Sequence, residues 1–236
     1  GYEVDVFTTS STFNDTFEEQ NDIRVHRYGT LFHLQSSNIS LNLHYKTLNH
    51  DVDLVHVSFD IPPAPLAGLR YARKKDLPLV LTHHGDWDAN YGGLLRRAGV
   101  IYHNAFLVEK ILSYADVIIS PSKTYSEKSN FLTKYCDKIT VIPNGINLEE
   151  YDTRLSKEEC RELLGLPLGS KVILFFGYLT PYKGPDVLLR AVKSILSKHP
   201  NTLLIFVGQG MMREELDILS RQLGIVKNVR FEGYVE

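Results

Sequence analysis

The chain has 236 residues, of which 43% are hydrophobic, so it is long enough for one large domain or two of modest size. Its formal charge of −2 argues against a nucleic-acid-binding protein, and its only two cysteines, Cys136 and Cys160, are too few for a disulfide framework. No run approaches the ~18 apolar residues of a membrane-spanning helix.

Short apolar runs recur along the chain, and segments with helical spacing of apolar residues lie between many of them. We expect strands over residues 4–8, 23–25, 54–57, 79–82, 117–120, 139–142, 172–176, 203–207 and 229–231. We expect helices over residues 64–75, 106–115, 122–135, 156–164, 185–199 and 211–223. This alternation predicts an α/β protein with parallel sheets covered on both faces, whose ligands lie at the carboxyl ends of the strands.

A domain boundary is expected between Asn144 and Ser170. Pro143-Asn144-Gly145 indicates a turn, and a charged helix that Gly165 would cap follows it. We therefore predict two Rossmann-like domains, one over residues 1–150 and one over 151–236. Because the chain opens directly on a strand and closes just after another, we expect both domains to be incomplete.

Residues 172–187 read as a buried strand, a glycine-bounded loop and the start of a helix. Gly177 permits a sharp exit from the strand because it lacks a Cβ, and Pro185 suits the first helical position. Lys183 and Gly184 would then stand beside the free N–H groups of a helix start, where a phosphate can bind. The pattern is neither a Walker loop nor a dinucleotide fingerprint. From the residues alone, a turn with a solvated lysine remains the alternative.

The polar segment that starts at His83 and His84 directly follows the expected strand 79–82. Its histidines, with Asp86 and Asp88, could bind a metal, but their spacing matches no zinc pattern, so we expect no metal site. A loop that faces a sugar or phosphate is one interpretation, because imidazole is a good hydrogen-bond donor. A loop histidine that is packed for structural reasons is the other.

Three further segments are weaker signals. Asn144 follows a strand too, but a structural turn is favoured there. Gly208 and Gly210 precede a helix and would let a ligand approach the backbone. Arg96 and Arg97, among apolar residues, indicate either a core-packed helix with a basic face or a contact with a lipid surface or an anionic acceptor.

In this order, these motifs resemble the family 4 retaining glycosyltransferases, which have the two-domain GT-B fold. The resemblance runs nearly end to end and rests on the segments 1–4, 82–86, 115–122, 141–147, 177–184, 207–210 and 229–235. It implies transfer of a sugar from a UDP- or GDP-linked donor to a saccharide or lipid-linked acceptor, with retained anomeric configuration. It implies no metal and no cofactor other than the donor, which is a substrate.

The resemblance also implies roles for single residues. Lys183 would contact the donor diphosphate, and His84 would lie near the transferred sugar and the acceptor, so these two are the expected catalytic residues. The expected substrate-binding residues are His83, Gly85, Asp86, Asn144, Gly177, Tyr178, Gly184, Gly208, Gly210, Tyr234 and Val235. Tyr178 departs from the family pattern, which usually has Arg at this position.

Two other functions stay open at this point. One is a sugar-nucleotide epimerase, which shares the two-domain architecture, and the other is a non-catalytic nucleotide-sugar-binding module, which Tyr178 slightly favours. We further expect a cytoplasmic protein of polysaccharide biosynthesis with no nucleic-acid partner and no obligate protein partner. Any contact with the membrane would be peripheral and on its inner face.

Overall fold

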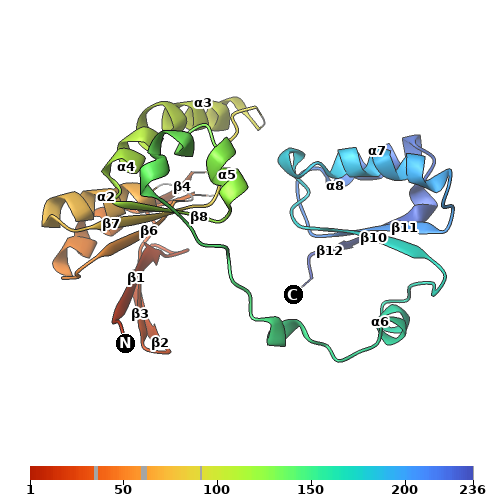
Figure 1. Ribbon diagram of the computed structural model, residues 1–236, viewed down its shortest axis with the longest axis horizontal. Helices are drawn as coiled ribbons and strands as arrows, with labels where there is room; N and C mark the ends of the chain where they lie inside the picture. Colours follow the sequence, from red (N-terminus) through yellow and green to blue (C-terminus); the bar gives the residue numbers. More distant parts are fainter. Residues whose placement is uncertain (35–36, 60–62, 91, 236) are drawn as a thin grey trace. The chain divides into compact units, whose positions relative to one another are not determined.

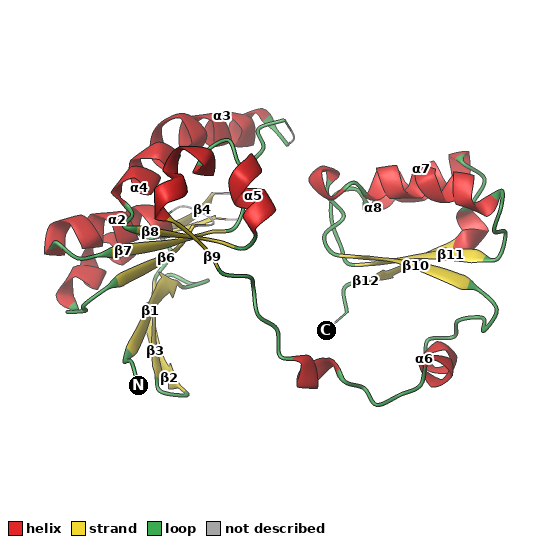
Figure 2. Ribbon diagram, in the orientation of Figure 1, coloured by secondary structure: helices red, strands yellow, loops and turns green. Residues whose placement is uncertain are grey.

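The computed structural model describes residues 1–34, 37–59, 63–90 and 92–235, which form two compact units, Gly1–Ile146 and Asn147–Glu236. Each unit is built of helices and mostly parallel strands, as predicted (Figure 2). None of the helices within the described residues is long and apolar enough to cross a membrane.

The first unit contains two larger sheets and a short hairpin. Its strands are β1 (Val4–Thr9), β2 (Thr16–Gln20), β3 (Ile23–Tyr28), β4 (Phe32–Leu34), β5 (Ser37–Ile39), β6 (Val55–Phe59), β7 (Leu79–His83), β8 (Val117–Ser120) and β9 (Ile139–Val141). Its helices are α1 (Asn42–Tyr45), α2 (Ala64–Lys75), α3 (Leu94–Tyr102), α4 (Val108–Tyr114) and α5 (Lys123–Lys128). Tighter or wider helical turns are η1 (Lys46–Asn49), the π-helical η2 (His103–Leu107) and η3 (Leu132–Lys138).

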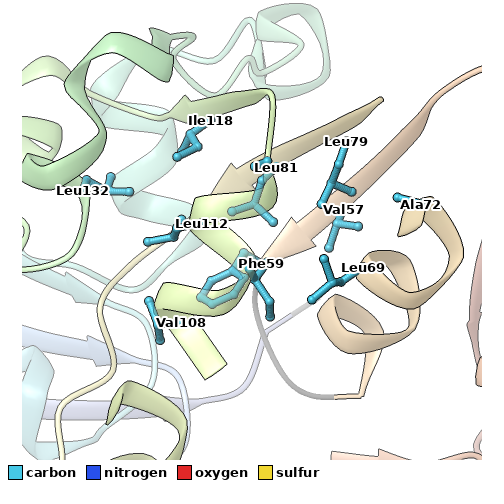
Figure 3. Close-up of a cluster of buried hydrophobic side chains, with 12 residues drawn as sticks. Val57, Phe59, Leu69, Ala72, Leu79, Leu81, Val108, Leu112, Ile118 and Leu132 are labelled. Carbon is cyan, nitrogen blue, oxygen red and sulfur yellow. The ribbon is translucent and has the colours of Figure 1, made fainter. Parts of the chain in front are cut away.

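The central sheet of the first unit has the order β6-β7-β8-β9, and its strands are all parallel. Helices α2, α4 and α5 lie on one face of this sheet (Figure 1). Between them and the strands, the side chains of Phe59, Leu81, Leu112 and Ile118 form a core that excludes solvent (Figure 3). In β7, buried and partly exposed residues alternate with the period of a strand, which places His83 on the core side.

The smaller sheet corrects the expectation of wholly parallel sheets. Strand β1 pairs in parallel with β3, but β2 pairs antiparallel with β3. The two-residue turn between β2 and β3 holds Asn21 and Asp22 at positive φ, as such hairpin turns require. Strand β2 was not predicted because its sequence does not alternate apolar and polar residues. Such alternation marks a strand with one buried face, and all five residues of β2 are exposed. The three-residue strands β4 and β5 are too short for such a pattern as well.

The second unit contains one parallel sheet with the order β10-β11-β12. Its strands are β10 (Lys171–Phe176), β11 (Thr202–Val207) and β12 (Val229–Gly233). Its helices are α6 (Lys157–Leu163), α7 (Pro185–Leu196) and α8 (Arg213–Gln222), with short turns η4 (Leu148–Tyr151), η5 (Pro181–Lys183) and η6 (Val226–Asn228). Helices α7 and α8 lie over one face of the sheet (Figure 1).

The expectation that strand 172–176 is covered on both faces is wrong within the described residues. Ile173 and Phe175 pack into the core, but Leu174 and Phe176, which point the other way, are 60% and 76% exposed. Strand β10 lies at the edge of its sheet, and an unbroken apolar run cannot by itself reveal that only one face is covered.

Two further predictions are also wrong. The helix expected over 122–135 is interrupted, because Ser129 has an extended backbone between α5 and η3. The turn expected at Pro143-Asn144-Gly145 does not form, and residues 142–147 run as exposed irregular chain. A residue before proline favours extended backbone, which suits such a segment.

The helix expected over 156–164 is present as α6, with a capping box between Ser156 and Glu159.

Candidate functional site

The three strands of the second unit end side by side, and each ends in a glycine with positive φ. These are Gly177 after β10, Gly208 after β11 and Gly233 at the end of β12, with φ of 139°, 131° and 76°. The N–H of Gly177 donates to the carbonyl oxygen of Val207 at 2.9 Å, and the N–H of Gly208 donates to that of Gly233 at 2.6 Å. The strand ends are therefore held together by backbone hydrogen bonds at the carboxyl edge of the sheet.

Close backbone packing explains why two of these loop positions are glycine. A Cβ at Gly208 would lie 2.1 Å from the carbonyl oxygen of Gly177, and one at Gly210 would lie 2.4 Å from that of Leu179. Both distances are far inside van der Waals contact. The sequence suggested that these glycines let a ligand approach, and the structure adds that the two loops need them to approach each other.

Helix α7 begins at this same edge. The turn η5 ends at Lys183, Gly184 takes the left-handed conformation with φ 65°, and Pro185 is the first helical residue, as expected. No side chain caps the helix, and in the described part of the chain the N–H groups of Asp186 and Val187 have no hydrogen-bond partner. A helix start of this kind attracts an anion.

Lys183 supplies a cation beside this helix start. Its side chain is exposed, and its ammonium lies 5.2 Å from the centre of the Tyr182 ring. Within the described residues it forms no ion pair. Tyr178, where the family usually has Arg, is 62% exposed on the loop that leads into this turn. The turn thus offers one cation and free amides to a ligand.

In the first unit, the loop after β7 is built around a buried histidine. His83 is 1% exposed, stacks on Phe59 with ring centroids 5.0 Å apart, and has its Nδ1 3.1 Å from the hydroxyl of Tyr125. Burial lowers the pKa of His83 to about 4, so its imidazole is neutral at pH 7. This burial favours a supporting role over the substrate contact expected from the sequence.

Asp86 ties the same loop to the break after α5. Its carboxylate accepts hydrogen bonds from the hydroxyl of Tyr125 at 2.6 Å, from that of Ser129 at 2.8 Å and from the N–H of Asn130 at 3.1 Å. Burial and this carboxylate raise the pKa of Tyr125. The bonds from Ser129 and Asn130 explain why the predicted helix 122–135 is interrupted there. Asp86 is therefore occupied by protein donors.

His84 remains open to solvent on this loop. Its Nε2 lies 3.0 Å from the hydroxyl of Ser58 on the neighbouring strand β6. Gly85 has no atom within 4 Å of the place where a Cβ would stand. His84 and Gly85 are thus the expected site residues of this loop that a ligand can reach.

The other expected site residues are exposed. Asn144 lies in the irregular segment after β9, and Tyr234 and Val235 follow β12, where they are 66% and 49% exposed. Their predicted ligand contacts stay predictions.

A separate group in the small sheet, Asp5, His26 and His50, places potential ligand atoms within 4.8 Å of one another. The Asp5 carboxylate, however, already accepts hydrogen bonds from Arg24 at 2.6 Å and from His26 at 2.9 Å. These bonds outweigh the effect of burial and lower the pKa of Asp5. The guanidinium supplies the positive charge that a metal ion would bring, so this group gives no argument for a metal site.

Sequence reasoning missed the partners that hold the loop after β7, namely Ser58, Tyr125, Ser129 and Asn130. Each lies 26 to 44 positions away in the chain from the residue it contacts. The sequence shows only that polar residues stand at the ends of strands and helices. That pattern does not tell which of them form hydrogen bonds with the loop after β7.

Comparison with known proteins identifies the family. Residues 1–150 match Glycosyltransferase Family 4, and residues 156–236 match Glycosyl transferases group 1. An uncharacterized glycosyltransferase of Methanocaldococcus jannaschii, MJ1607, is 31% identical over 100% of this chain and 62% of its own length. The O-antigen chain mannosyltransferase C of Escherichia coli is 29% identical over 99% of this chain and 58% of its own. The chain thus spans about three fifths of these relatives.

Among solved structures, HepE of Anabaena in complex with UDP and glucose superposes with a TM-score of 0.64. It covers 91% of this chain and 57% of its own at 22% identity, a likeness that shows the fold. The expected architecture of Rossmann-like α/β units with parallel sheets, the GT-B class, is confirmed. The chain belongs to glycosyltransferase family 4.

Proposed function

We propose that the protein transfers a hexose from a UDP- or GDP-linked donor to a saccharide or lipid-linked acceptor, with retention of anomeric configuration. Membership of the family supports nucleotide-sugar-dependent transfer. The bound UDP and glucose of HepE and the mannosyltransferase name of the Escherichia coli relative support the substrate class. The donor would be a substrate, and no other cofactor is proposed.

The observation that carries this proposal is the start of α7. Transfer breaks the bond between the sugar C1 and a phosphate oxygen, so negative charge grows on the leaving diphosphate. The free N–H groups of Asp186 and Val187 are fixed donors that can stabilise that charge, and the exposed Lys183 ammonium can approach it. The second unit would therefore hold the donor.

The loop after β7 would serve the acceptor side. His84 is exposed and could orient the sugar or the acceptor hydroxyl, while buried His83 and Asp86 keep the loop in place. We do not assign His84 as a general base. The free, isolated cysteines Cys136 and Cys160 support a reducing compartment, and with it the proposed cytoplasmic location.

Calorimetric titration of the protein with UDP and with GDP tests the donor site. Lys183→Ala should weaken binding of the preferred nucleotide at least tenfold, because a hydrogen bond to a charged group contributes about 1.5–3 kcal/mol. Lys193→Ala, which removes another exposed lysine of α7, is the matched control and should bind as the wild type. If the two variants bind the nucleotide with equal affinity, Lys183 does not contact it.

A turnover assay then separates the alternatives. Free nucleoside diphosphate together with a glycosylated acceptor identifies a transferase, and the anomeric signal of the product in NMR shows whether configuration is retained. An isomerised donor identifies an epimerase. Nucleotide binding without either product, in a chain extended to the length of the relatives, identifies a binding module.

A further inference from the structure

Helix α3 and the turn η2 hold the loop after β7 through three consecutive backbone carbonyl groups. Each carbonyl oxygen accepts a hydrogen bond from a side chain of this helical segment, at 2.9 to 3.1 Å. The donor and acceptor pairs are Asn104 Nδ2 with Trp87, Arg96 Nη1 with Asp88, and Arg97 Nε with Ala89. The carbonyl groups of an irregular surface loop commonly bind water, so three side-chain donors in a row indicate that α3 and η2 set the path of this loop.

The two arginines suit this contact. A guanidinium group stays charged and carries several donors in fixed geometry, so its bonds to carbonyl groups are stronger than those of a neutral donor. Arg96 also packs against the loop, because a Cβ at Gly92, where φ is 85°, would lie 2.7 Å from Arg96 Cδ. The sequence suggested a basic helix face at Arg96 and Arg97, and the structure adds that both guanidinium groups bind the backbone of the loop.

Asn104 connects the loop to a buried histidine. Because its NH₂ group donates to the Trp87 carbonyl, its Oδ1 is the atom that lies 3.2 Å from Nδ1 of His103, and that nitrogen must carry the proton. His103 is 4% exposed, and its ring stacks on that of Trp87 with centroids 4.7 Å apart. Within the described residues its Nε2 has no hydrogen-bond partner, so the bond with Asn104 and the packing of the ring fix its orientation.

The turn η2, which supplies this histidine and this asparagine, is π-helical. Such turns are rare in proteins and occur frequently at functional sites. The Asp86 carboxylate fixes the same loop to α5 and to the residues that follow α5. Residues 86–89 are therefore held by two different parts of the first unit. His84 and Gly85 lie directly before this stretch and are open to a ligand.

We propose that Arg96, Arg97 and Asn104 are positioning residues for sugar transfer. They fix the end of the loop, so that His84 and Gly85 meet the acceptor in one conformation. A site that is ordered before the ligand binds loses less conformational freedom on binding, and a small misplacement of a contact group costs rate. The inference rests on the proposed function, because that function gives His84 the role of orienting the sugar or the acceptor. It involves no residue of the nucleotide site in the second unit.

Asn104→Asp tests whether the loop is held in this way, because a carboxylate has the size of the amide but cannot donate to the Trp87 carbonyl. In the folded protein, acrylamide quenching of Trp87 fluorescence should rise about twofold, and hydrogen exchange of residues 84–90 should become about tenfold faster. Asn90→Asp adds the same charge at an exposed position of the same loop, so it is the matched control and should change neither. Arg97→Lys, which keeps a cationic donor, should raise the quenching less than Arg97→Ala.

Turnover tests the positioning role, in the chain extended to the length of the relatives. Release of nucleoside diphosphate is measured from UDP-glucose and GDP-mannose, with octyl mannoside as the acceptor probe. Asn104→Asp should lower kcat about tenfold or more and leave the affinity for UDP and GDP unchanged. Because the positioning acts through His84, His84→Ala/Asn104→Asp should lose no more rate than His84→Ala.

Three results overturn the inference. One is quenching and hydrogen exchange in Asn104→Asp that equal those of Asn90→Asp. Another is a double variant in which the two losses of rate multiply. The third is full rate in Asn104→Asp beside a tenfold loss in His84→Ala, which refutes the positioning role alone. Full rate in both single variants refutes the proposed role of the loop in transfer as well.

Discussion

Replacing Asp86 by Asn should destabilise the first unit markedly, although the side chain keeps its size. The carboxylate accepts bonds from Tyr125 at 2.6 Å, from Ser129 at 2.8 Å and from the N–H of Asn130 at 3.1 Å. An amide offers one acceptor oxygen and a donor NH₂ group. The NH₂ group would therefore face one of these donors, which then loses its partner.

The cost can be bounded from these contacts. A hydrogen bond to a charged group contributes about 1.5–3 kcal/mol, and an unsatisfied buried donor costs about 1–3 kcal/mol. The Asp86 side chain is 23% exposed, so water can replace part of what is lost. We therefore expect Asp86→Asn to lower the free energy of unfolding by about 2 kcal/mol.

Trp87 is the only tryptophan in the sequence, so its fluorescence reports the unfolding of the first unit. It stacks on His103 of η2 with ring centroids 4.7 Å apart, so its fluorescence in urea follows the unfolding of this loop and of η2. Asp88→Asn is the control, because the Asp88 side chain is exposed on the same loop and its carboxylate accepts a hydrogen bond from the N–H of Asn90 at 2.8 Å. If the two variants shift the urea midpoint equally, Asp86 does not anchor the loop.

Three further predictions follow from the same contacts. The free energy of unfolding of the first unit should fall as the pH is lowered from 6.5 to about 4, because His83 binds a proton below pH 6.5 when unfolded but only near pH 4 when folded. His83→Gln should therefore flatten this part of the curve of urea midpoint against pH. A curve that the substitution leaves unchanged would refute the reasoning. Gly208→Ala should destabilise the second unit by about 3 kcal/mol or more in thermal unfolding, since its Cβ meets the Gly177 carbonyl at 2.1 Å, whereas Gly145→Ala, with open space around its Cβ, should not. Tyr178→Arg should tighten UDP or GDP binding about tenfold by adding a charge-assisted bond to the diphosphate; unchanged affinity would mean that position 178 does not face the ligand.

The sequence predicted those helices and strands whose limits are set by residues within the segment itself. The limits of α2 and β8 were predicted to the residue, and the start of α7 was predicted because Gly184 and Pro185 define it. Strand β2 could not be predicted, since its residues are all exposed and it is held by pairing with β3. The exposure of Leu174 could not be predicted either, because coverage of a sheet face depends on which other elements pack there.

The candidate site divides in the same way. At the start of α7 the groups proposed to face the donor are backbone amides and one neighbouring lysine, so a short motif specifies them. Around β7 the arrangement depends on side chains distant in sequence. Histidine spacing alone gave His83 and His84 similar prospects, but the structure buries His83 against Phe59 and leaves His84 exposed beside Ser58.

The first turn of α7 also carries an acidic residue, which sharpens the role of Lys183. The carboxylate of Asp186 complements the positive end of the helix, a contribution of about 0.3–1 kcal/mol, so α7 does not need a bound anion to be stable. The same charge repels a diphosphate and offsets part of the attraction of the helix start. The attraction that remains must come largely from the Lys183 ammonium, because a charge on a flexible side chain can approach the ligand while Asp186 turns away. A site dominated by the helix start would tolerate Lys183→Ala, whereas this site should not.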